Sequence, residues 1–452
     1  MTYRYRVATV FLLGFFIDCI NMFMPAIALP TITGQFAVAS AASAWVGNAY
    51  MLGLTLVIPL STWLSARWGP RRVLAASMLA FALSAWGCGQ ASSFAALIAW
   101  RLAQGMAGGL LIPVGQALTF NLFQGPQRAR VSTLVMAVAL LAPALSPSIG
   151  GLIVDRYSWP WVFHANLPFA LLTAALAWAW IAEAPGNRQP RPDFKGLLLV
   201  SGALACLLSG MSLYGAGHGS LVLLASLAAG LACALLYRAH YRHAGHGIVE
   251  LTLLASARLR VAMLVYHAIP GVFTGVNLLN IFYLQQVLHL SAHATGLYMI
   301  LYAAGAFIAM LAVGRLYNRV GARRLLLLGM LVHSLGIALL ARVDSAAHNP
   351  LLIAAYGLMG LGGGMGANAA QTTALLDFNG ERMQQASVLW NLNRQMAFSL
   401  GATLLLMLFN LWPEGTDAPQ AYHLTFALAA LLGLVPIMRL RALPLEPPCH
   451  AR

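Results

Sequence analysis

Charge is scarce in this chain of 452 residues. Asp, Glu, Lys and Arg together make up only 8% of the sequence, whereas 60% of it is hydrophobic. This shortage of charge excludes a soluble protein of this size and indicates one that crosses a membrane many times. The hydrophobic stretches are continuous rather than alternating with polar residues, which favours helical spans over a β-barrel.

Fourteen stretches of the sequence are long enough to cross a bilayer as helices, since a span needs about 20 apolar residues. We therefore expect an all-α polytopic membrane protein. A cleaved signal peptide is not expected, because the first apolar stretch is too long for one and contains Asp18 and Asn21. The expected spans are residues 7–29, 42–64, 73–91, 95–120, 131–154, 159–183, 196–214, 219–237, 258–284, 296–317, 323–342, 350–376, 385–411 and 420–440.

Acidic residues are outnumbered 11 to 26 by basic ones, which gives a net charge of +15. If the N-terminus lies in the cytoplasm, nearly all basic residues fall in cytoplasmic loops or tails, and only Arg156 and Arg342 fall outside. This positive-inside pattern predicts that both termini are cytoplasmic. Membrane topology thus accounts for the basic charge, so nucleic acid is not an expected partner and a lipid bilayer is. Lys195 is the only lysine, which with the abundance of Ala and Leu indicates a GC-rich bacterial genome, and a bacterial inner membrane is the expected location.

Cysteine is also rare, and the five cysteines (Cys19, Cys88, Cys206, Cys233 and Cys449) lack the spacing of a metal or redox site. No metal and no cofactor is expected. The sequence contains no clustered catalytic set and no cytoplasmic domain that would carry one, so an enzyme is not expected either.

A nine-residue pattern occurs twice, at residues 64–72 and 316–324. Each copy has an Arg two residues before a Gly and an Arg pair two and three residues after it. The repeat predicts two related bundles, as in many transporters. Between them lie Pro-rich and polar linkers that flank two additional spans with few polar groups. The predicted domains are a six-helix bundle over 1–183, a linker with two additional helices over 184–257, and a second six-helix bundle over 258–452.

Motifs along nearly the whole chain resemble the major facilitator superfamily, specifically its fourteen-helix drug:proton antiporter branch. Residues 101–109 match the fourth-helix motif R-x-x-Q-G, and residues 143–151 resemble the antiporter motif that ends G-P-x-x-G-G, with Ser146 in place of the first Gly. Residues 159–168 resemble W-R-W-x-F-x-x-N-x-P, with Pro160 in place of Arg. Ala28-Leu29-Pro30 closes the first helix as in the family, and residues 391–401 resemble the branch's eleventh core helix.

Two positions depart from the family pattern. The loop motif normally carries an Asp three residues before its Gly, where this chain has Ala66 and, in the second copy, Asn318. In the family that Asp belongs to a charge network that braces the outward-facing state, so its loss argues against the same network here, although the arginines remain. The branch's first-helix acid corresponds in position to Asn21, whereas the acid of this chain, Asp18, lies one turn earlier.

Only three charged side chains lie in the middle of apolar stretches: Asp18, Arg101 and Arg394. A charge at that depth costs at least ~2.5–3.5 kcal/mol, so each indicates a function. A carboxyl whose pKa changes as its cavity becomes wet suits a proton carrier, and the motif match implies that Arg101 is its partner. The alternatives are structural: Asp18 is a partner for an Arg or for polar neighbours, and Arg101 braces helices through backbone carbonyls. Arg394 either meets an anionic or zwitterionic substrate or anchors its bundle.

Further polar residues at membrane depth are candidates for a substrate cavity, although any one of them is more often a helix–helix hydrogen bond. With Arg394, these candidates are Asn21, Asn48, Tyr50, Gln116, Asn277, Asn280, Tyr302, Asn368 and Gln371. Proline kinks and close glycine contacts could seal the path against proton leak. The predicted gating and antiporter set is Arg67, Gly69, Arg71, Pro143, Pro147, Gly150 and Gly151.

The sequence therefore predicts a proton-coupled antiporter that exports drugs or other small molecules by alternating access. The alternatives are an exporter dedicated to one metabolite, such as an amino acid, sugar or siderophore, and a non-transporting membrane sensor. The expected partners are a small-molecule substrate, protons and the bilayer; a monomer is expected, and a periplasmic adaptor is left open. Because Asp18 is the only acid at mid-membrane depth, neutral, zwitterionic or anionic substrates are favoured over multiply charged cations.

Overall fold

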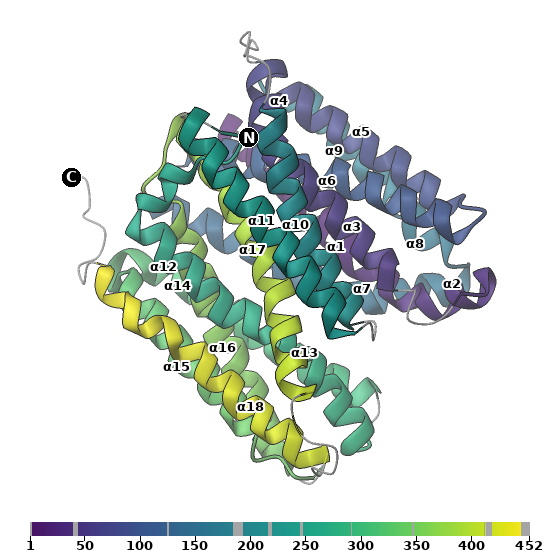
Figure 1. Cartoon of the computed structure of the whole chain (residues 1–452), viewed down its shortest axis with the longest axis vertical. Helices are drawn as coiled ribbons and strands as arrows, with labels where there is room; N and C mark the ends of the chain where they lie inside the picture. The colour runs from purple at the N-terminus through teal and green to yellow at the C-terminus, as the bar shows by residue number, and fades with distance from the viewer. Residues whose placement is uncertain are drawn as a thin grey trace. The chain divides into compact units, whose positions relative to one another are not determined.

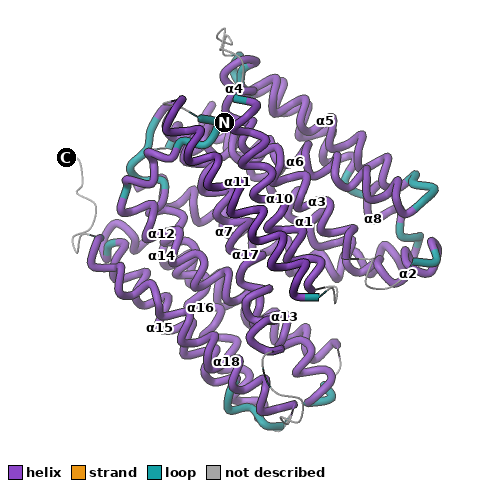
Figure 2. Tube along the Cα trace, viewed as in Figure 1, coloured by secondary structure: helices purple, strands orange, loops and turns teal. Residues whose placement is uncertain are grey.

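The computed structural model describes residues 2–38, 44–123, 126–183, 193–215, 219–244, 247–290, 292–345, 348–410, 412 and 418–443. Within these ranges the chain is helical, and no strand occurs (Figure 2). An all-α architecture is what the long apolar stretches predict, because a helix satisfies every backbone hydrogen bond within its own segment.

The first half of the chain forms eleven α-helices with short 3₁₀ segments between some of them (Figure 1). Their bounds are α1 Tyr3–Phe23, η1 Met24–Ala28, α2 Leu29–Phe36, α3 Ala44–Val57, η3 Ile58–Leu60, α4 Ser61–Trp68, α5 Pro70–Gly89, α6 Phe94–Leu122, α7 Pro126–Arg156, α8 Pro160–His164, α9 Leu167–Trp180, α10 Phe194–Gly215 and α11 Ser220–Ala244.

The second half continues with α12 to α18, and two of its irregular segments are π-helical. Their bounds are η4 Leu251–Ala255, α12 Ala257–Tyr266, η5 His267–Gly271, α13 Val272–Phe282, η6 Tyr283–Val287, α14 Ala292–Val320, α15 Ala322–Leu340, α16 Asn349–Ala374, α17 Gly380–Asn410, α18 Ala418–Leu434 and η8 Val435–Ala442.

Among the described residues, 12 helical segments are long and apolar enough to cross a membrane, judged by length and composition. They coincide with twelve of the expected spans. The remaining two expected spans, 131–154 and 196–214, lie within α7 and α10, and the described part of α10 forms a shorter apolar helix over Phe194–Gly210. The chain is therefore an all-α, multi-pass membrane protein, as predicted.

The first span ends earlier than its apolar stretch. Helix α1 stops at Phe23, six residues before the predicted end, and a 3₁₀ turn over Met24–Ala28 follows. Proline at position 25 explains the stop, because it lacks the N–H that would continue the α-helical hydrogen bonds. The prediction that Ala28-Leu29-Pro30 closes the first helix is wrong in detail: Leu29 begins α2, and Pro30 lies in its first turn.

Packing divides the chain into two compact units. Unit 1 comprises Met1–Phe123, Leu141–Thr252 and Phe378–Leu392, and unit 2 comprises Gln124–Leu140, Leu253–Asp377 and Asn393–Arg452. Helices α7 and α17 thus contribute residues to both units. The predicted domain boundaries at 183 and 257 follow the order of the chain, and they stay a prediction.

In unit 1, α6 packs against α1, α3 and α5. The backbones of α6 and α3 lie in direct contact, without side chains between them. A Cβ atom at Gly53 would lie 2.1 Å from the Leu102 carbonyl oxygen, and one at Gly105 would lie 2.0 Å from that of Tyr50. Gly109 also lies close to α3, where its Cβ would meet the Leu54 oxygen at 2.5 Å. Small residues permit such an approach between membrane helices.

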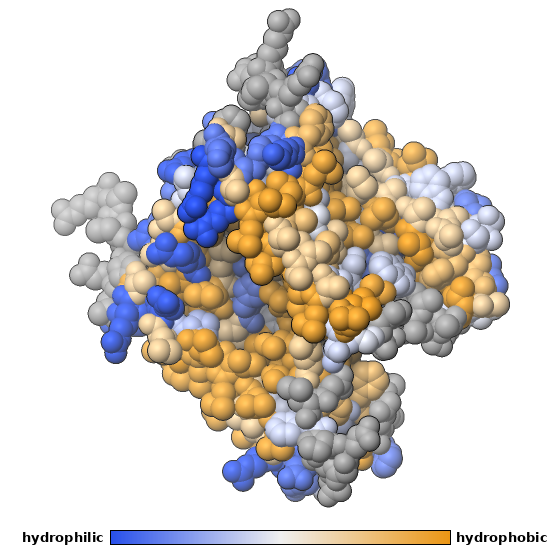
Figure 3. All heavy atoms as spheres, viewed as in Figure 1, coloured by the Kyte–Doolittle hydropathy of each residue, from blue (hydrophilic) through white to orange (hydrophobic). Residues whose placement is uncertain are grey.

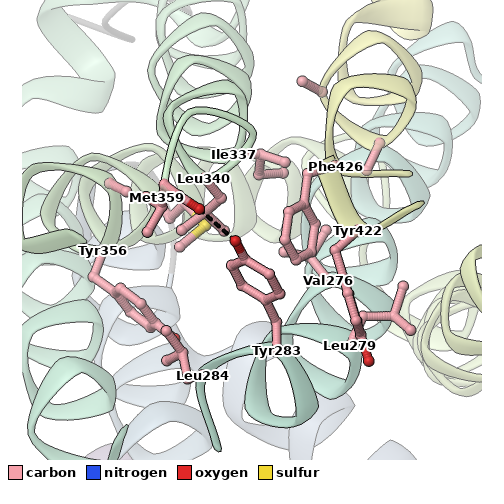
Figure 4. Close-up of a cluster of buried hydrophobic side chains, with 14 of the residues drawn as sticks. Val276, Leu279, Tyr283, Leu284, Ile337, Leu340, Tyr356, Met359, Tyr422 and Phe426 are labelled. Atoms are coloured by element: carbon pink, nitrogen blue, oxygen red, sulfur yellow. Dashed lines mark hydrogen bonds between the residues drawn. The ribbon is translucent and has the colours of Figure 1, made fainter. Parts of the chain in front are cut away.

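In unit 2, α16 packs against α12, α14 and α15. Its glycines again allow contact, since a Cβ at Gly360 would lie 2.2 Å from the Tyr302 oxygen and one at Gly362 2.2 Å from the His333 nitrogen. A buried apolar cluster surrounds Tyr283, whose hydroxyl donates a hydrogen bond to the Val343 carbonyl (Figure 4). Polar groups in this core are thus tied to the backbone.

Candidate functional site

A carboxyl group is buried in the second half of the first span. Asp18 lies on α1 with only 3% of its surface exposed. The hydroxyl of Tyr50, on α3, donates a hydrogen bond to Asp18 Oδ1, and Tyr50 is itself fully buried. Hydrogen bonds to ionised groups are roughly twice as strong as neutral ones. The tyrosine therefore supplies the carboxyl group with a donor at a depth where the lipid offers none.

Gly108 on α6 leaves the space that this pair occupies. A Cβ atom at this position would lie 2.6 Å from Asp18 Oδ1 and 3.2 Å from the Tyr50 hydroxyl oxygen. No side chain larger than hydrogen therefore fits at residue 108 while the two groups stay bonded. The second half of the motif, Gly105, Gly108 and Gly109, thus serves two purposes, helix contact and room for the acid.

The guanidinium of Arg101 is buried on the face of the same tyrosine. Its central carbon lies 4.4 Å from the centre of the Tyr50 ring and 5.6 Å from that of Phe163. Arg101 has no exposed surface, so protein groups must replace water around its charge. Its nitrogens donate to the Asn21 side-chain oxygen at 2.7 Å, the Gln104 side-chain oxygen at 2.8 Å, the Val46 carbonyl at 2.8 Å and the Asn21 carbonyl at 3.3 Å.

Tyr50 connects the two charges. None of the four bonds that Arg101 donates goes to Asp18. Instead the phenol bonds the carboxyl through its hydroxyl and meets the guanidinium with its ring. The predicted pair is thus a group of four residues, in which Asn21 also bonds Arg101. We call Asp18, Asn21, Tyr50 and Arg101 the acid cluster.

Helical spacing explains why these residues meet. Asp18 and Asn21 are three residues apart and share one face of α1. Arg101, Gln104 and Gly108 are separated by three and four residues and share one face of α6. The motif spacing is therefore the spacing of a helix face that turns toward α1 and α3.

Three contributors to this site were missed from sequence: Gln104, Gly108 and the Val46 carbonyl. The spacing within residues 101–109 could have identified the first two, whereas the carbonyl of an apolar residue leaves no signal. Gln104 is fully buried, and its side-chain oxygen also lies 3.8 Å from the Cys88 sulfur. The amide nitrogens of Asn21 and Gln104 are buried and donate to no residue in the described part of the chain.

The other cavity candidates of unit 1 lie apart from the acid cluster. Gln116 on α6 is buried and accepts a hydrogen bond of 2.6 Å from the Asn391 amide. Asn48 lies on α3 and is half-buried. Two candidates, Asn21 and Tyr50, belong to the acid cluster itself, so the structure groups them with the proton-coupling prediction.

The remaining candidates belong to unit 2, and several have partners there. Asn280 donates to the Tyr356 hydroxyl at 2.6 Å. Asn368 bonds the Thr133 hydroxyl at 3.0 Å and the Met310 carbonyl at 3.1 Å. Such bonds fit the helix–helix role that competes with a substrate contact.

The other four candidates of unit 2 differ from one another in contacts and burial. Tyr302 stacks on Phe273 with ring centres 4.0 Å apart. Gln371 is fully buried, and neither atom of its amide bonds a described residue. Asn277 is half-buried, with its buried oxygen likewise unbonded within the described chain. Arg394 lies on α17 with 7% of its surface exposed.

The repeated loop motif has the same backbone conformation in both copies. Gly69 has φ 79° and ψ 151°, and Gly321 has φ 84° and ψ 155°. Each glycine ends one helix and begins the next, at a φ that residues with a side chain rarely adopt. This shared geometry explains why both copies keep glycine, although each lacks the family's Asp.

The arginines of the first copy have other partners. Arg72 bonds Glu183 at 2.5 Å, and Arg71 approaches the same carboxylate at 3.9 Å while its guanidinium lies 4.4 Å from the centre of the Trp178 ring. Arg67 is exposed and lies over Trp63 at 5.4 Å. The carboxylate that these two arginines approach is therefore that of Glu183, an exposed residue beyond the end of α9.

The prolines of the predicted antiporter motif lie inside α7. The helix runs through positions 143 and 147 without a break, with Gly150 buried and Gly151 half-buried.

Within the described chain, no group of three or more His, Cys, Asp or Glu residues is arranged to hold a metal ion.

Comparison with known proteins relates this architecture to membrane transporters. The family model described as the Major Facilitator Superfamily matches residues 11–257 and 262–452. A "Multidrug resistance protein B homolog" of Mycobacterium tuberculosis is 30% identical over 410 residues, which is 89% of this chain and 76% of the relative. The "Multidrug export protein EmrB" of Haemophilus influenzae is 26% identical over 400 residues, 87% of this chain and 78% of the relative.

A solved structure has the same fold. The human organic anion transporter MFSD10 superposes with a TM-score of 0.68 over 97% of this chain and 100% of that one, at 18% identity. At this identity the likeness concerns the fold alone, and it agrees with the predicted fold class.

Proposed function

Since the chain belongs to the major facilitator superfamily, in its fourteen-helix drug:proton antiporter branch, we propose that it is a proton-coupled antiporter that exports drugs or other small molecules across the bacterial inner membrane by alternating access. The names of its relatives support export of drugs. The observation that carries the proton coupling is the buried Asp18 carboxyl with its Tyr50 donor.

The acid cluster gives a proton two states with different electrostatics. With Asp18 ionised, the carboxylate accepts from Tyr50 and balances the positive charge of Arg101 across the ring. With Asp18 protonated, the cluster carries an uncompensated positive charge in a medium of low dielectric, where such a charge is costly. Binding a proton thus changes which arrangement of α1, α3 and α6 is most stable, and this is what couples it to a conformational equilibrium.

The test uses purified protein in liposomes with an imposed pH gradient. One pH unit is worth about 1.36 kcal/mol per proton, which supports about a tenfold substrate gradient per proton exchanged. D18N is expected to insert and fold but to build no gradient. Asp344 offers the matched control, because its carboxylate is 69% exposed, and D344N should export like the unmutated protein. Full proton-driven export by D18N would refute the coupling.

Substrate range separates the proposal from an exporter of one metabolite. Chemically unrelated compounds should compete with one another for export. If only one class competes, such as amino acids, sugars or siderophores, the dedicated exporter is correct.

The same proposal places both termini in the cytoplasm. Arg4 and Arg6 at the start of α1 and Arg439 and Arg441 at the end of η8 support this orientation through the positive-inside rule. Reporter fusions that are active only in the cytoplasm should be active at both ends, and activity of a periplasmic reporter would contradict it.

A further inference from the structure

An apolar groove lies in unit 2 where two spans end. Helix α12 begins there at Ala257, and η8 ends there at Ala442. The groove encloses about 280 Å³ and is lined by Ala257, Arg260, Val261, Leu264, Arg439 and Ala442. On the face drawn in Figure 3, hydrophilic side chains near this end of α12 and η8 border a band of hydrophobic ones. The groove therefore spans the change from polar surface to apolar surface.

Two arginines mark the polar end of this groove, and both are exposed. The Arg260 guanidinium is held in place, since its Nη1 atom donates to the Leu254 carbonyl at 2.8 Å and the Ala255 carbonyl at 3.4 Å. These bonds use neutral acceptors, so they leave the charge of Arg260 uncompensated. Arg439 adds a second positive charge on the opposite wall.

No carboxylate lines this groove within the described chain. The carboxylate of Asp377 contacts the start of α12. It already accepts hydrogen bonds from Arg258 and, at 2.7 Å, from the Ser256 hydroxyl. The groove thus presents two cations and no anion. An anionic ligand would be bound favourably, whereas the ammonium of a zwitterionic ligand would find no partner.

The rest of the groove is apolar and continues onto the apolar surface. Val261 is buried against the groove, Ala257 is half-buried, and Ala442 and Leu264 are exposed, Leu264 by 45%. Along η8, Val435 is 60% and Met438 82% exposed. In a membrane-spanning segment, side chains exposed in this way contact acyl chains rather than water.

We propose that this groove binds one anionic phospholipid. Arg260 and Arg439 hold its phosphate, and an acyl chain lies against Val261 and Leu264. Arginine suits the headgroup because its planar fork matches phosphate oxygens, and basic pockets between membrane helices bind anionic headgroups in this way. The site is separate from the acid cluster, and it stands whether or not the chain exports drugs.

The test measures lipid binding to the full-length protein purified in detergent. Native mass spectrometry should show one retained phosphatidylglycerol and little phosphatidylcholine at equal concentration. R260Q/R439Q should weaken phosphatidylglycerol binding about thirtyfold, which corresponds to ~1 kcal/mol for each arginine at about 1.4 kcal/mol per tenfold. If the double variant does not fold, R439Q alone should give about a fivefold loss, since Arg439 is exposed in the last turn of η8.

Two further variants distinguish a groove from general attraction. R238Q/R242Q removes two exposed charges from the end of α11, where no groove-lining residue lies, and should bind lipid like the unmutated protein. A442L keeps both groove arginines but fills the apolar wall, and it should weaken phosphatidylglycerol binding.

Several results would overturn the proposal. One is equal retention of phosphatidylcholine by the unmutated protein. An equal loss of binding in R238Q/R242Q, or no loss in A442L, would assign the effect to surface charge. Phosphatidylglycerol binding only after removal of residues 444–452 would assign the groove to the chain's own C-terminal tail. Inorganic phosphate at millimolar concentration should not compete; full competition would also overturn the proposal, because the groove would then bind the headgroup chemistry and no lipid.

Discussion

Replacing Gly108 by alanine tests the geometry of the acid cluster with a single methyl group. The new Cβ would lie 2.6 Å from Asp18 Oδ1, whereas ordinary contacts begin at 3.4 Å. The carboxylate must therefore move by about 0.8 Å. The helix itself has little freedom to yield, because Gly105 and Gly109 hold α6 against the backbone of α3.

A carboxylate that moves off the Tyr50 hydroxyl to relieve this contact weakens or loses the hydrogen bond that the phenol donates. Hydrogen bonds between oxygens have lengths of about 2.7–2.8 Å and are lost near 3.5 Å. A buried charged acceptor that loses its donor costs ~1.5–3 kcal/mol. If the whole of this free energy is added to the barrier for transport, proton-driven export falls by ten- to roughly hundredfold. Helix propensity acts in the opposite sense, since alanine is favoured over glycine by up to ~1 kcal/mol.

The assay is export into liposomes under an imposed pH gradient, together with thermal unfolding in detergent. G47A is the matched control, because Gly47 lies on α3 in the same unit and a Cβ there would meet nothing within 4 Å. It should match or slightly exceed the unmutated protein in Tm and export at the same rate. G108A should lose both Tm and export.

A double-mutant cycle shows whether the methyl group acts through the hydrogen bond. Y50F removes the same donor, so G108A should cost little more in a Y50F background than Y50F costs alone. If the two effects simply add, or if G108A exports within twofold of G47A, the geometric reasoning is refuted.

Three further changes test other parts of the structure. G53A should prevent close packing of α3 and α6, because its Cβ would lie 2.1 Å from a backbone oxygen, and should lower Tm sharply. R101K should abolish export without preventing insertion, since an ammonium cannot reproduce the guanidinium's fork. Burial raises the pKa of Glu250, but hydrogen bonds from Thr252 and Tyr241 lower it by more, to below its ordinary value. This stabilisation is lost as pH falls through the folded-state pKa, so E250Q should lower Tm most near pH 7, and the difference from the unmutated protein should shrink as the pH is lowered below the ordinary glutamate pKa.

The spans and the functional charges could be predicted from sequence because they depend on local composition. Asp18 and Arg101 stand out as charges in apolar stretches, and the helical spacing of residues 101–109 identifies a face. Their connection could not be predicted in this way. Asp18 and Tyr50 are 32 residues apart on different helices, so only tertiary packing decides that a tyrosine, rather than a direct ion pair, lies between the two charges.

Polar residues near one another in sequence were the least predictable. Asn391 bonds Gln116 in unit 1, whereas Asn393 bonds His267 at 3.1 Å in unit 2. Residues two positions apart on a helix point about 200° apart around its axis, so neighbours in a polar run contact different parts of the protein. The early end of α1 has a local cause, Pro25, that the apolar content of the stretch concealed.

The hydrogen bonds of Arg101 also bear on how the protein is made. Its acceptors outside α6 are Asn21 on α1 and Val46 on α3, and both precede Arg101 in the chain. Chains are synthesised and begin to fold from the N-terminus. When the ribosome has synthesised α6, the segments that accept hydrogen bonds from the Arg101 guanidinium are therefore already present. The order of the sequence lets the most costly side chain of this unit enter the bilayer after the groups that make its insertion tolerable.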